Sequence, residues 1–281
     1  MNRLAGIALG LLLACGAELS TPASNPDPGT DPGTGPGTGS GACGSGAPAA
    51  GVTNGSLDVA GVRRTFVLVL PTAEAGEPLP VYFVFHGAGG TGQEFRNWMR
   101  FESNATRPGI FVYPDGLADS GGSTGWPNTG GRDVAFFDAL LAHVKTRACV
   151  DEQRVFATGF SYGGYMSNTL GCARAGVVRA IAPLSGGLFS SRSCTRVPAA
   201  VWISHGTTDD PVPLTQGEAA RNYWTSVNGC GSGTSAVEPA PCRSYQGCAA
   251  GNPVVWCQFD GGHEVPSWVY KGVMGFFEAL R

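Results

Sequence analysis

The chain has 281 residues, of which 42% are hydrophobic and 14% are charged, and its formal net charge is −3. This length allows one large domain or two small ones, and the apolar fraction is sufficient for a real core. No basic patch stands out along the sequence, which argues against nucleic acid or an acidic polymer as a partner.

Residues 1–14 have the pattern of a secretory signal. A short positive start precedes an apolar run from Leu4 to Ala14, which is too short to span a bilayer. The run ends Leu-Leu-Ala-Cys and resembles a bacterial lipobox, so we expect cleavage before Cys15 and lipid attachment to it. The alternative is an ordinary signal peptide in which Cys15 is incidental.

Residues 15–50 are interpreted as the lipidated Cys15 followed by a Pro/Gly/Thr-rich linker. The segment contains PGTDPGTGPGTG, a composition that cannot bury a core and stays extended and solvated. It would act as a stalk, with membrane contact only through the lipid anchor at Cys15. Residues 51–281 are then expected to form the folded domain.

The cysteines indicate export. Nine are present, and setting Cys15 aside leaves an even number, which predicts up to four disulfides. The eight are Cys43, Cys149, Cys172, Cys194, Cys230, Cys242, Cys248 and Cys257. Spacing does not fix the connectivity, but we expect Cys43 to pair with Cys149 and Cys172 with Cys194. No CxxC pair or helical HxxxH occurs, so no metal site is expected.

Predicted strands and helices alternate along residues 51–281. Strands are predicted at Arg64–Pro71 (in a hairpin after the Ala60-Gly61 turn), Val81–Gly87, Ile110–Gly116, Val155–Ser161, Arg179–Gly186, Ala200–Gly206 and Val254–Gly262. Helices are predicted at 133–147, with Asp133 as N-cap, and at Gly163–Arg174, Thr215–Val227 and Ser267–Leu280. This alternation predicts an α/β fold with a mostly parallel sheet flanked by helices, in a single domain.

Ser161 is the predicted nucleophile. It lies in a G-x-S-x-G motif, Gly159 to Gly163, where a strand gives way to a helix. The glycines are needed because a side chain at either position would clash across the sharp turn. The turn lifts the Ser hydroxyl and places the Tyr162 amide at a helix N-terminus, where an oxyanion is favoured. A plain tight turn is the alternative.

A serine nucleophile needs a base, and the chain has four histidines: His86, His143, His205 and His263. His263 follows the last predicted strand, which suits the chain order nucleophile, acid, base. His143 is assigned to a surface or packing role in its helix, and His86 and His205 each end a strand in His-Gly. The acid is expected in HGTTDDPVP, where the sequence leaves Asp209 and Asp210 both open.

Two further features of the site are predicted from loops. The Gly-rich FHGAGGTG follows a strand, and the Ala88 amide is expected as an oxyanion donor beside that of Tyr162. A phosphate loop is the alternative, but the G-K-[ST] ending is missing. Trp126, in a Gly-rich loop, is expected to line the substrate cleft together with the Tyr162 side chain. Burial of Trp126 beneath that loop is the alternative.

Six segments together resemble a known enzyme family: FHGAGGTG, GWPNTGGRDVAFFDALL, RVFATGFSYGGYMS, VWISHGTTDDPVP, YQGC and VVWCQFDGGHEVP. From about Cys43 to the C-terminus, the chain resembles the feruloyl and acetyl-xylan esterases of carbohydrate esterase family 1 and their poly(3-hydroxybutyrate) depolymerase-like relatives. The resemblance implies an α/β-hydrolase catalytic domain over 51–281, without metal or cofactor. It selects Asp209 as the acid and agrees with Ser161, His263 and Ala88.

The resemblance also implies the reaction: hydrolysis of feruloyl or acetyl esters of plant cell-wall polysaccharide through an acyl-enzyme. We expect a secreted or cell-surface protein, as a probable bacterial lipoprotein would be, acting as a monomer. A depolymerase of polyester substrates, a general carboxylesterase and a peptidase are alternatives with the same mechanism. A silent cell-surface binding protein is another, which the loss of Ser161, the acid or His263 would have favoured; none is lost.

Overall fold

A computed structural model of the protein describes residues 42–44, 46–189 and 194–280. All of the described residues lie within Gly39–Arg281. The predictions of a signal at residues 1–14 and of lipid on Cys15 therefore lie outside the described residues. Within those residues, no helix is both long and apolar enough to cross a bilayer.

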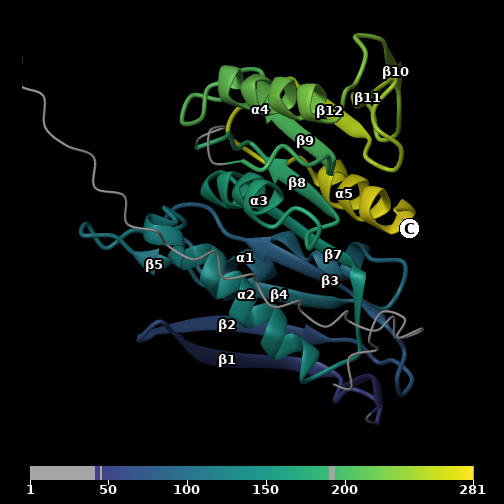
Figure 1. Ribbon diagram of the computed structural model, residues 1–281. Coiled ribbons are helices and arrows are strands. Elements are labelled where there is room, and N and C mark those ends of the chain that lie inside the picture. Colours follow the sequence, from purple (N-terminus) through teal and green to yellow (C-terminus); the bar gives the residue numbers. More distant parts are fainter. Residues whose placement is uncertain (1–41, 45, 190–193, 281) are drawn as a thin grey trace, which may run out of the picture. The chain divides into compact units, whose positions relative to one another are not determined.

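A ten-stranded sheet forms the centre of the domain (Figure 1), with the strand order β1-β2-β4-β3-β7-β8-β9-β12-β11-β10. The strands are β1 (Gly51–Val59), β2 (Val62–Leu70), β3 (Leu79–Phe85), β4 (Ile110–Pro114), β7 (Val150–Phe160), β8 (Ala180–Leu184), β9 (Ala200–Gly206), β10 (Thr234–Ala236), β11 (Arg243–Tyr245) and β12 (Val254–Phe259). The strands from β4 to β12 in this order run parallel, and the outer ones are antiparallel. The predicted hairpin at Ala60-Gly61 is confirmed as β1–β2.

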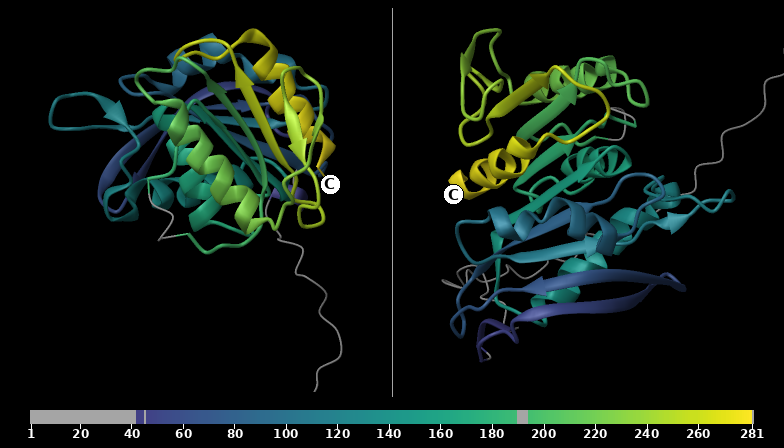
Figure 2. Two further views of the ribbon diagram at one scale, coloured as in Figure 1. Left: turned by 90° about the horizontal axis from the view of Figure 1, so that it is seen from above. Right: turned by 180° about the vertical axis from the view of Figure 1, so that it is seen from behind.

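Helices cover both faces of this sheet (Figure 2). They are α1 (Gly92–Met99), α2 (Arg132–Lys145), α3 (Tyr162–Ala173), α4 (Leu214–Val227) and α5 (Ser267–Ala279), with short 3₁₀ turns at Ala42–Gly44, Phe101–Asn104 and Thr129–Gly131. Because side chains alternate along a strand, Phe83 packs with α2, α3 and α4, whereas Tyr82 and Val84 pack with α1 and α5. The α/β-hydrolase fold expected from the sequence is confirmed.

The start of α2 differs from the prediction that Asp133 is its N-cap. The helix begins at Arg132, and the Asn128 side chain accepts hydrogen bonds from the amides of Asp133 (3.0 Å) and Val134 (3.1 Å). The Asp133 carboxylate is instead buried and forms an ion pair with Arg64 at 2.9 Å. A buried carboxylate needs a cation or several donors, and this requirement outweighs a capping role at the surface.

The small antiparallel pair β5 (Leu117–Ala118) and β6 (Thr124–Gly125) was not predicted, and neither were β10, β11 and α1. The β5–β6 pair is too short for its residues to show a period-two pattern. It forms because the loop after β4 turns back on itself beside the start of α2. This small hairpin lies against the loop that follows β3.

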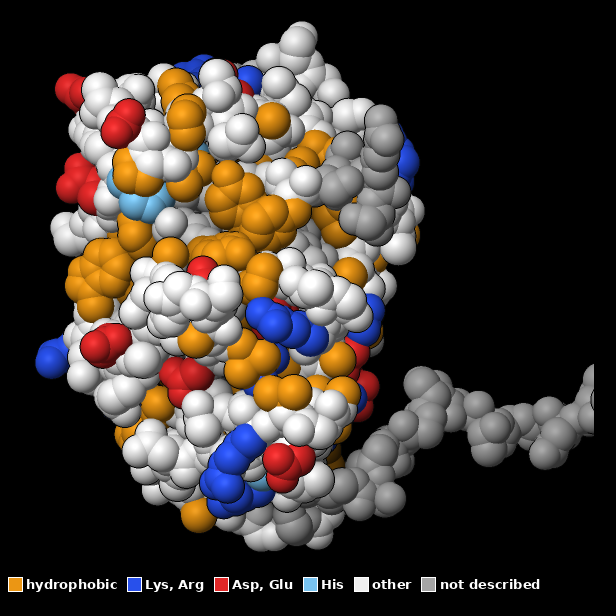
Figure 3. Space-filling model, turned by 90° about the vertical axis from the view of Figure 1, so that its left-hand side faces the viewer, with side chains coloured by type: hydrophobic (Ala, Val, Ile, Leu, Met, Phe, Trp, Pro, Cys, Tyr) orange, Lys and Arg blue, Asp and Glu red, His pale blue; other side chains and the backbone are white. Residues whose placement is uncertain are grey.

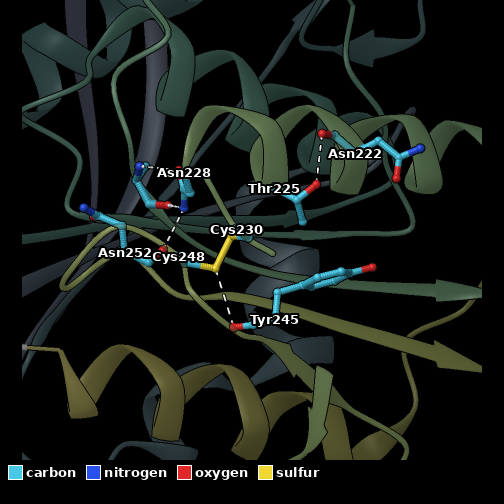
Figure 4. The surroundings of a disulfide bond; sticks show 8 residues. Asn222, Thr225, Asn228, Cys230, Tyr245, Cys248 and Asn252 are labelled. Atoms are coloured by element: carbon cyan, nitrogen blue, oxygen red, sulfur yellow. Dashed lines mark hydrogen bonds between the residues drawn. A yellow bond between two sulfur atoms is a disulfide. The ribbon is translucent and has the colours of Figure 1, made fainter. Parts of the chain in front are cut away.

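Four disulfides are present, and both expected pairs, Cys43–Cys149 and Cys172–Cys194, are among them. The other two join Cys230 to Cys248 and Cys242 to Cys257. Figure 4 shows the Cys230–Cys248 bridge close to Asn228, at the end of α4. The buried Asn228 amide donates to the carbonyls of Ala199 (2.7 Å) and Asn252 (2.8 Å). The Cys230–Cys248 disulfide and the side-chain amide of Asn228 together hold the segments that lead into β9 and β12.

We predict that all eight cysteines of the described domain are oxidised in protein exported to an oxidising compartment. Alkylation without reductant, followed by intact-mass measurement, should label none of them, and alkylation after reduction should label all. Replacing Cys242 and Cys257 together by Ser should lower the free energy of unfolding by about 2–4 kcal/mol, measured in urea. Eight alkylated thiols in unreduced exported protein would contradict the prediction.

Candidate active site

Ser161 occupies a strained turn between β7 and α3. Its φ is 55° and its ψ is −115°, a conformation that is uncommon for any residue other than Gly. A Cβ built on Gly159 would lie 2.5 Å from the carbonyl oxygen of Phe85, and one on Gly163 would overlap the same atom. Both glycines are therefore required by sterics, for the reason inferred from the sequence, and the Ser hydroxyl is presented at the end of β7.

Asp209 and His263 meet in two neighbouring loops. The loop after β9 carries Asp209 and the loop after β12 carries His263, and the distance from His263 Nδ1 to Asp209 Oδ2 is 2.8 Å. Because a carboxylate only accepts hydrogen bonds, Nδ1 donates and Nε2 is left to accept a proton. The other oxygen, Oδ1, accepts from the amide of Val212 at 2.9 Å. Asp209 is only 5% exposed, whereas Asp210 is exposed, so Asp209 alone is brought to His263.

Packing joins the histidine loop to the serine turn. The Phe160 ring, next to Ser161 in sequence, lies over the His263 ring with 4.5 Å between centroids. The Ser161 amide donates to the carbonyl of Leu184 at the end of β8 (2.9 Å), and the Ser185 hydroxyl reaches the carbonyl of Glu264 at 3.4 Å. Ser161, Asp209 and His263 thus follow the carboxyl ends of β7, β9 and β12, and His263 packs on the residue before Ser161.

The loop after β3, which carries Ala88, lies beside the serine turn. Gly87 packs directly against the serine, since a Cβ built on it would lie 3.5 Å from Ser161 Cβ. Nowhere in the described ranges does the amide of Ala88 or of Tyr162 have a protein acceptor. The loop is held against the β5–β6 hairpin, because the Gly89 amide donates to the Thr124 carbonyl (2.8 Å). Two free amides therefore flank the serine turn.

His86 fixes the start of this loop. The side chain is fully buried, and its Nε2 accepts a hydrogen bond from the amide of Gly116 at 2.8 Å. The proton consequently lies on Nδ1, which donates to the Gly87 carbonyl at 2.6 Å. Burial lowers the pKa of the His86 imidazole, which keeps it neutral near pH 7. His86 thus holds the start of this loop through its two ring nitrogens.

The prediction that Trp126 lines the substrate cleft is wrong. Its side chain is 0% exposed and packs edge-on against Phe85, with 5.0 Å between ring centroids. The indole N–H donates to the carbonyl of His86 at 2.9 Å. An indole has one polar atom, so a single well-placed carbonyl allows the whole ring to be buried behind the loop.

Trp98, on α1, is an exposed aromatic that the sequence analysis missed. It is 50% exposed, and its ring contacts the Phe160 ring edge-on at 5.5 Å. It lines a cavity of about 260 Å³ that also includes Ala88 and Phe160. A capping box marks the start of α1: the Thr91 hydroxyl accepts from the Glu94 amide (3.2 Å) and donates to its carboxylate (2.9 Å). That T-x-x-E pattern was the available signal.

Tyr162 lies on the other side of the serine turn. It is partly buried against Gly125, and its ring contacts the half-exposed Phe189 at 5.7 Å. Figure 3 shows the side of the domain on which β5 lies in Figure 1, and hydrophobic side chains gather there around an exposed histidine. The Tyr162 side chain is half-buried, whereas that of Trp126 is fully buried, and contact of Tyr162 with substrate stays a prediction.

The parts present suit acyl transfer. A hydroxyl on a strained turn can act as a nucleophile, a carboxylate-held imidazole can accept its proton, and free amides can stabilise an oxyanion. Across residues 42–44, 46–189 and 194–280, no three His, Cys, Asp or Glu side chains converge as a metal site would require.

Comparisons with known proteins agree with this geometry. Residues 133–244 match the Phospholipase/Carboxylesterase family. The chain is 37% identical over 237 residues to feruloyl esterase C of Emericella nidulans, covering 79% of this chain and 84% of that protein. It is 33% identical to feruloyl esterase D of Neurospora crassa, covering 79% and 81%.

Solved structures share the fold at low sequence identity. An acetyl xylan esterase from Aspergillus awamori superposes with a TM-score of 0.61 at 17% identity, covering 80% of this chain and 99% of that one. A ferulic acid esterase from Anaeromyces mucronatus, solved with ferulic acid, gives a TM-score of 0.57 at 16% identity, covering 83% and 91%. The fungal relatives add no support for lipid on Cys15.

Replacing Trp126 and replacing Trp98 should have different effects on the free energy of unfolding. Trp126→Ala removes a fully buried indole and is expected to cost about 3–5 kcal/mol of unfolding free energy. Trp98→Ala, at a half-exposed site, should cost less than about 1.5 kcal/mol. Urea denaturation measures both. Equal losses in the two variants would show that the burial of Trp126 does not carry this stability.

Proposed function

Because the chain belongs to the family of its feruloyl esterase relatives, we propose that this carboxylic ester hydrolase removes feruloyl or acetyl groups from plant cell-wall polysaccharide. The observation that carries the proposal is the 2.8 Å hydrogen bond between His263 and the buried Asp209, packed against the Ser161 turn. The activities of the relatives support the substrate class, and the geometry of the loops supports the choice of residues.

The proposed reaction passes through an acyl-enzyme. His263 Nε2 takes the proton of the Ser161 hydroxyl, and the oxygen attacks the ester carbonyl. The amides of Ala88 and Tyr162 donate to the oxyanion of the tetrahedral intermediate. His263 then protonates the leaving alcohol, after which it activates a water molecule that releases the acid and restores Ser161.

Asp209 supports this cycle electrostatically. Its carboxylate fixes the Nδ1–H tautomer of His263 and stabilises the imidazolium that forms when the serine proton is transferred. The carboxylate is buried, so its charge is poorly screened and acts strongly on the ring it contacts. Asp210, exposed beside it, is solvated and takes no part in the proposal.

An aromatic acyl group is favoured by the side chains beside the serine. The rings of Trp98 and Phe160 border the 260 Å³ cavity that contains Ala88. We propose that the feruloyl ring packs on the exposed face of Trp98, while the ester carbonyl reaches the two amides. Aromatic pairs of this kind contribute about 0.5–1.5 kcal/mol beyond area burial. An acetyl group would leave this face unused.

The four disulfides support a site of action outside the cytoplasm. Such bonds persist in oxidising compartments and are rare where glutathione keeps thiols reduced. We propose that the enzyme is exported and meets its polymeric substrate outside the cell.

Removing any triad member should abolish most esterase activity. Ser161→Ala, Asp209→Asn and His263→Ala are each expected to lower kcat by about 10⁴-fold or more on methyl ferulate, with the fold retained. Asp210→Asn is the matched control and should stay within about threefold of the parent. If Asp210→Asn is inactive and Asp209→Asn is active, the assignment of the acid is wrong.

Trp98→Ala should discriminate between acyl groups. Loss of the indole face is expected to raise KM for methyl ferulate about tenfold and to leave KM for p-nitrophenyl acetate within about twofold. Steady-state kinetics on both esters measures the effect, and Trp98→Phe should recover part of the difference. Equal changes for the two substrates would remove Trp98 from the proposed acyl site.

A further inference from the structure

His205 is a second histidine at the acid loop, and the reaction proposed above does not use it. It lies at the end of β9, four residues before Asp209, and is 0% exposed. Its Nε2 is 2.8 Å from the carbonyl oxygen of Val212 and 3.4 Å from Asp209 Oδ2. Both oxygens can only accept, so Nε2 carries a proton, which it donates to the Val212 carbonyl while Asp209 Oδ2 lies close by.

The other ring nitrogen is left without a partner. Within the described residues, His205 Nδ1 is buried and makes no hydrogen bond. It faces α4, where a Cβ built on Gly217 would overlap Nδ1 itself. Burial lowers the pKa of the His205 imidazole, so the ring is neutral near pH 7. His205 is thus a neutral donor with its proton fixed on Nε2.

We propose that His205 is a positioning residue for ester hydrolysis, one that holds the Asp209 carboxylate in the orientation His263 requires. The inference rests on the proposed triad. Three contacts close a small ring: His205 Nε2 to the Val212 carbonyl, the Val212 amide to Asp209 Oδ1, and His205 Nε2 toward Asp209 Oδ2. With both oxygens engaged, the carboxylate cannot rotate without losing a donor.

Neutrality of the ring is what makes this arrangement useful. A buried carboxylate needs donors to remain ionised, but a second cation beside it would compete with the imidazolium of His263. A neutral N–H supplies the donor without that competition. The other ionisable groups that act on His205 or Asp209 are Glu218 on α4 and Tyr165 on α3, and Glu264 follows His263 in the base loop.

Three replacements of His205 test the role of Nε2. The amide nitrogen of Gln reaches the position of Nε2, whereas that of Asn reaches only the position of Nδ1. His205→Gln should keep kcat on p-nitrophenyl acetate within about threefold. His205→Asn and His205→Leu should lower kcat by about 10- to 100-fold, the scale seen when an outer partner of a functional imidazole is removed, with KM nearly unchanged.

The pH profile separates positioning from packing. Without the Nε2 N–H nearby, the negative charge of Asp209 is less stabilised and favours the imidazolium form of His263 more strongly. The acid limb of kcat/KM should therefore move to higher pH in His205→Asn and His205→Leu but not in His205→Gln. A limb that stays in place in all three folded variants overturns the proposal.

A substitution on α4, Gly217→Ala, tests the position of the His205 ring without changing His205 itself. The added methyl group would press on Nδ1 and displace the imidazole, so it should reproduce the kcat loss and the pH shift while every triad residue is unchanged. Gly275→Ala on α5 is the matched control, because a Cβ there meets nothing within 4 Å, and its kinetics should equal those of the parent. This pair decides the matter even if His205→Leu fails to fold.

Failure of the inference and failure of the triad give different results. If Asp209→Asn is inactive while His205→Leu keeps the parent kcat and pH profile, the positioning role is wrong and the triad stands. If Asp209→Asn retains activity, the proposed function is wrong, and the positioning role of His205, which depends on it, is wrong as well. Equal losses in His205→Gln and His205→Leu, at an unmoved acid limb, would reduce His205 to a packing residue.

Discussion

The carbonyl of Phe85 lies so close to Gly159 and Gly163 that no side chain fits at either position. This approach of β3 to the serine turn decides where the rest of the site can be. It places the loop after β3 beside Ser161, where a Cβ on Gly87 would lie 3.5 Å from Ser161 Cβ. The positive φ of Ser161 is held by the same packing, because a strained backbone persists only where its surroundings leave no alternative.

A His-Gly pair stands at the ends of two strands of the sheet, and both histidines form hydrogen bonds to the loop that follows. His86 ends β3 and His205 ends β9, and both are fully buried with a lowered pKa caused by burial. Each neutral ring uses hydrogen bonds to fix the loop that follows, the oxyanion loop in one case and the acid loop in the other. His263, the proposed base, differs from both in that its side chain retains 18% exposure.

A hydrophobic layer behind these loops supplies their rigidity. Trp126 is buried under the oxyanion loop with its indole N–H on the His86 carbonyl. At the other end of the sheet, Asn228 and the Cys230–Cys248 bridge join the entries of β9 and β12. β9 and β12 pair in parallel from these entries to the ends that precede Asp209 and His263.

The sequence alone determined the elements that have strong local signals. Continuous apolar runs marked the parallel strands, G-x-S-x-G marked the turn at Ser161, and chain order pointed to His263. The choice of Asp209 over Asp210 came only with the family resemblance, since the two carboxylates are adjacent and differ in nothing local. Burial and the hydrogen bond to His263 distinguish them in the folded chain.

Only the tertiary structure decided which aromatic residues are buried and which partners His205 contacts. Trp126 stands in a Gly-rich loop and Trp98 in a polar helical segment, yet the loop residue is fully buried and the helix residue half exposed. An indole is buried only where a segment distant in sequence provides a space for the ring and a carbonyl for its N–H. For Trp126 this segment is the end of β3, and no local sequence pattern reveals that contact. In the same way, the partners of His205 are a loop carbonyl, a carboxylate and a glycine on α4, which meet only because the chain folds back across the sheet.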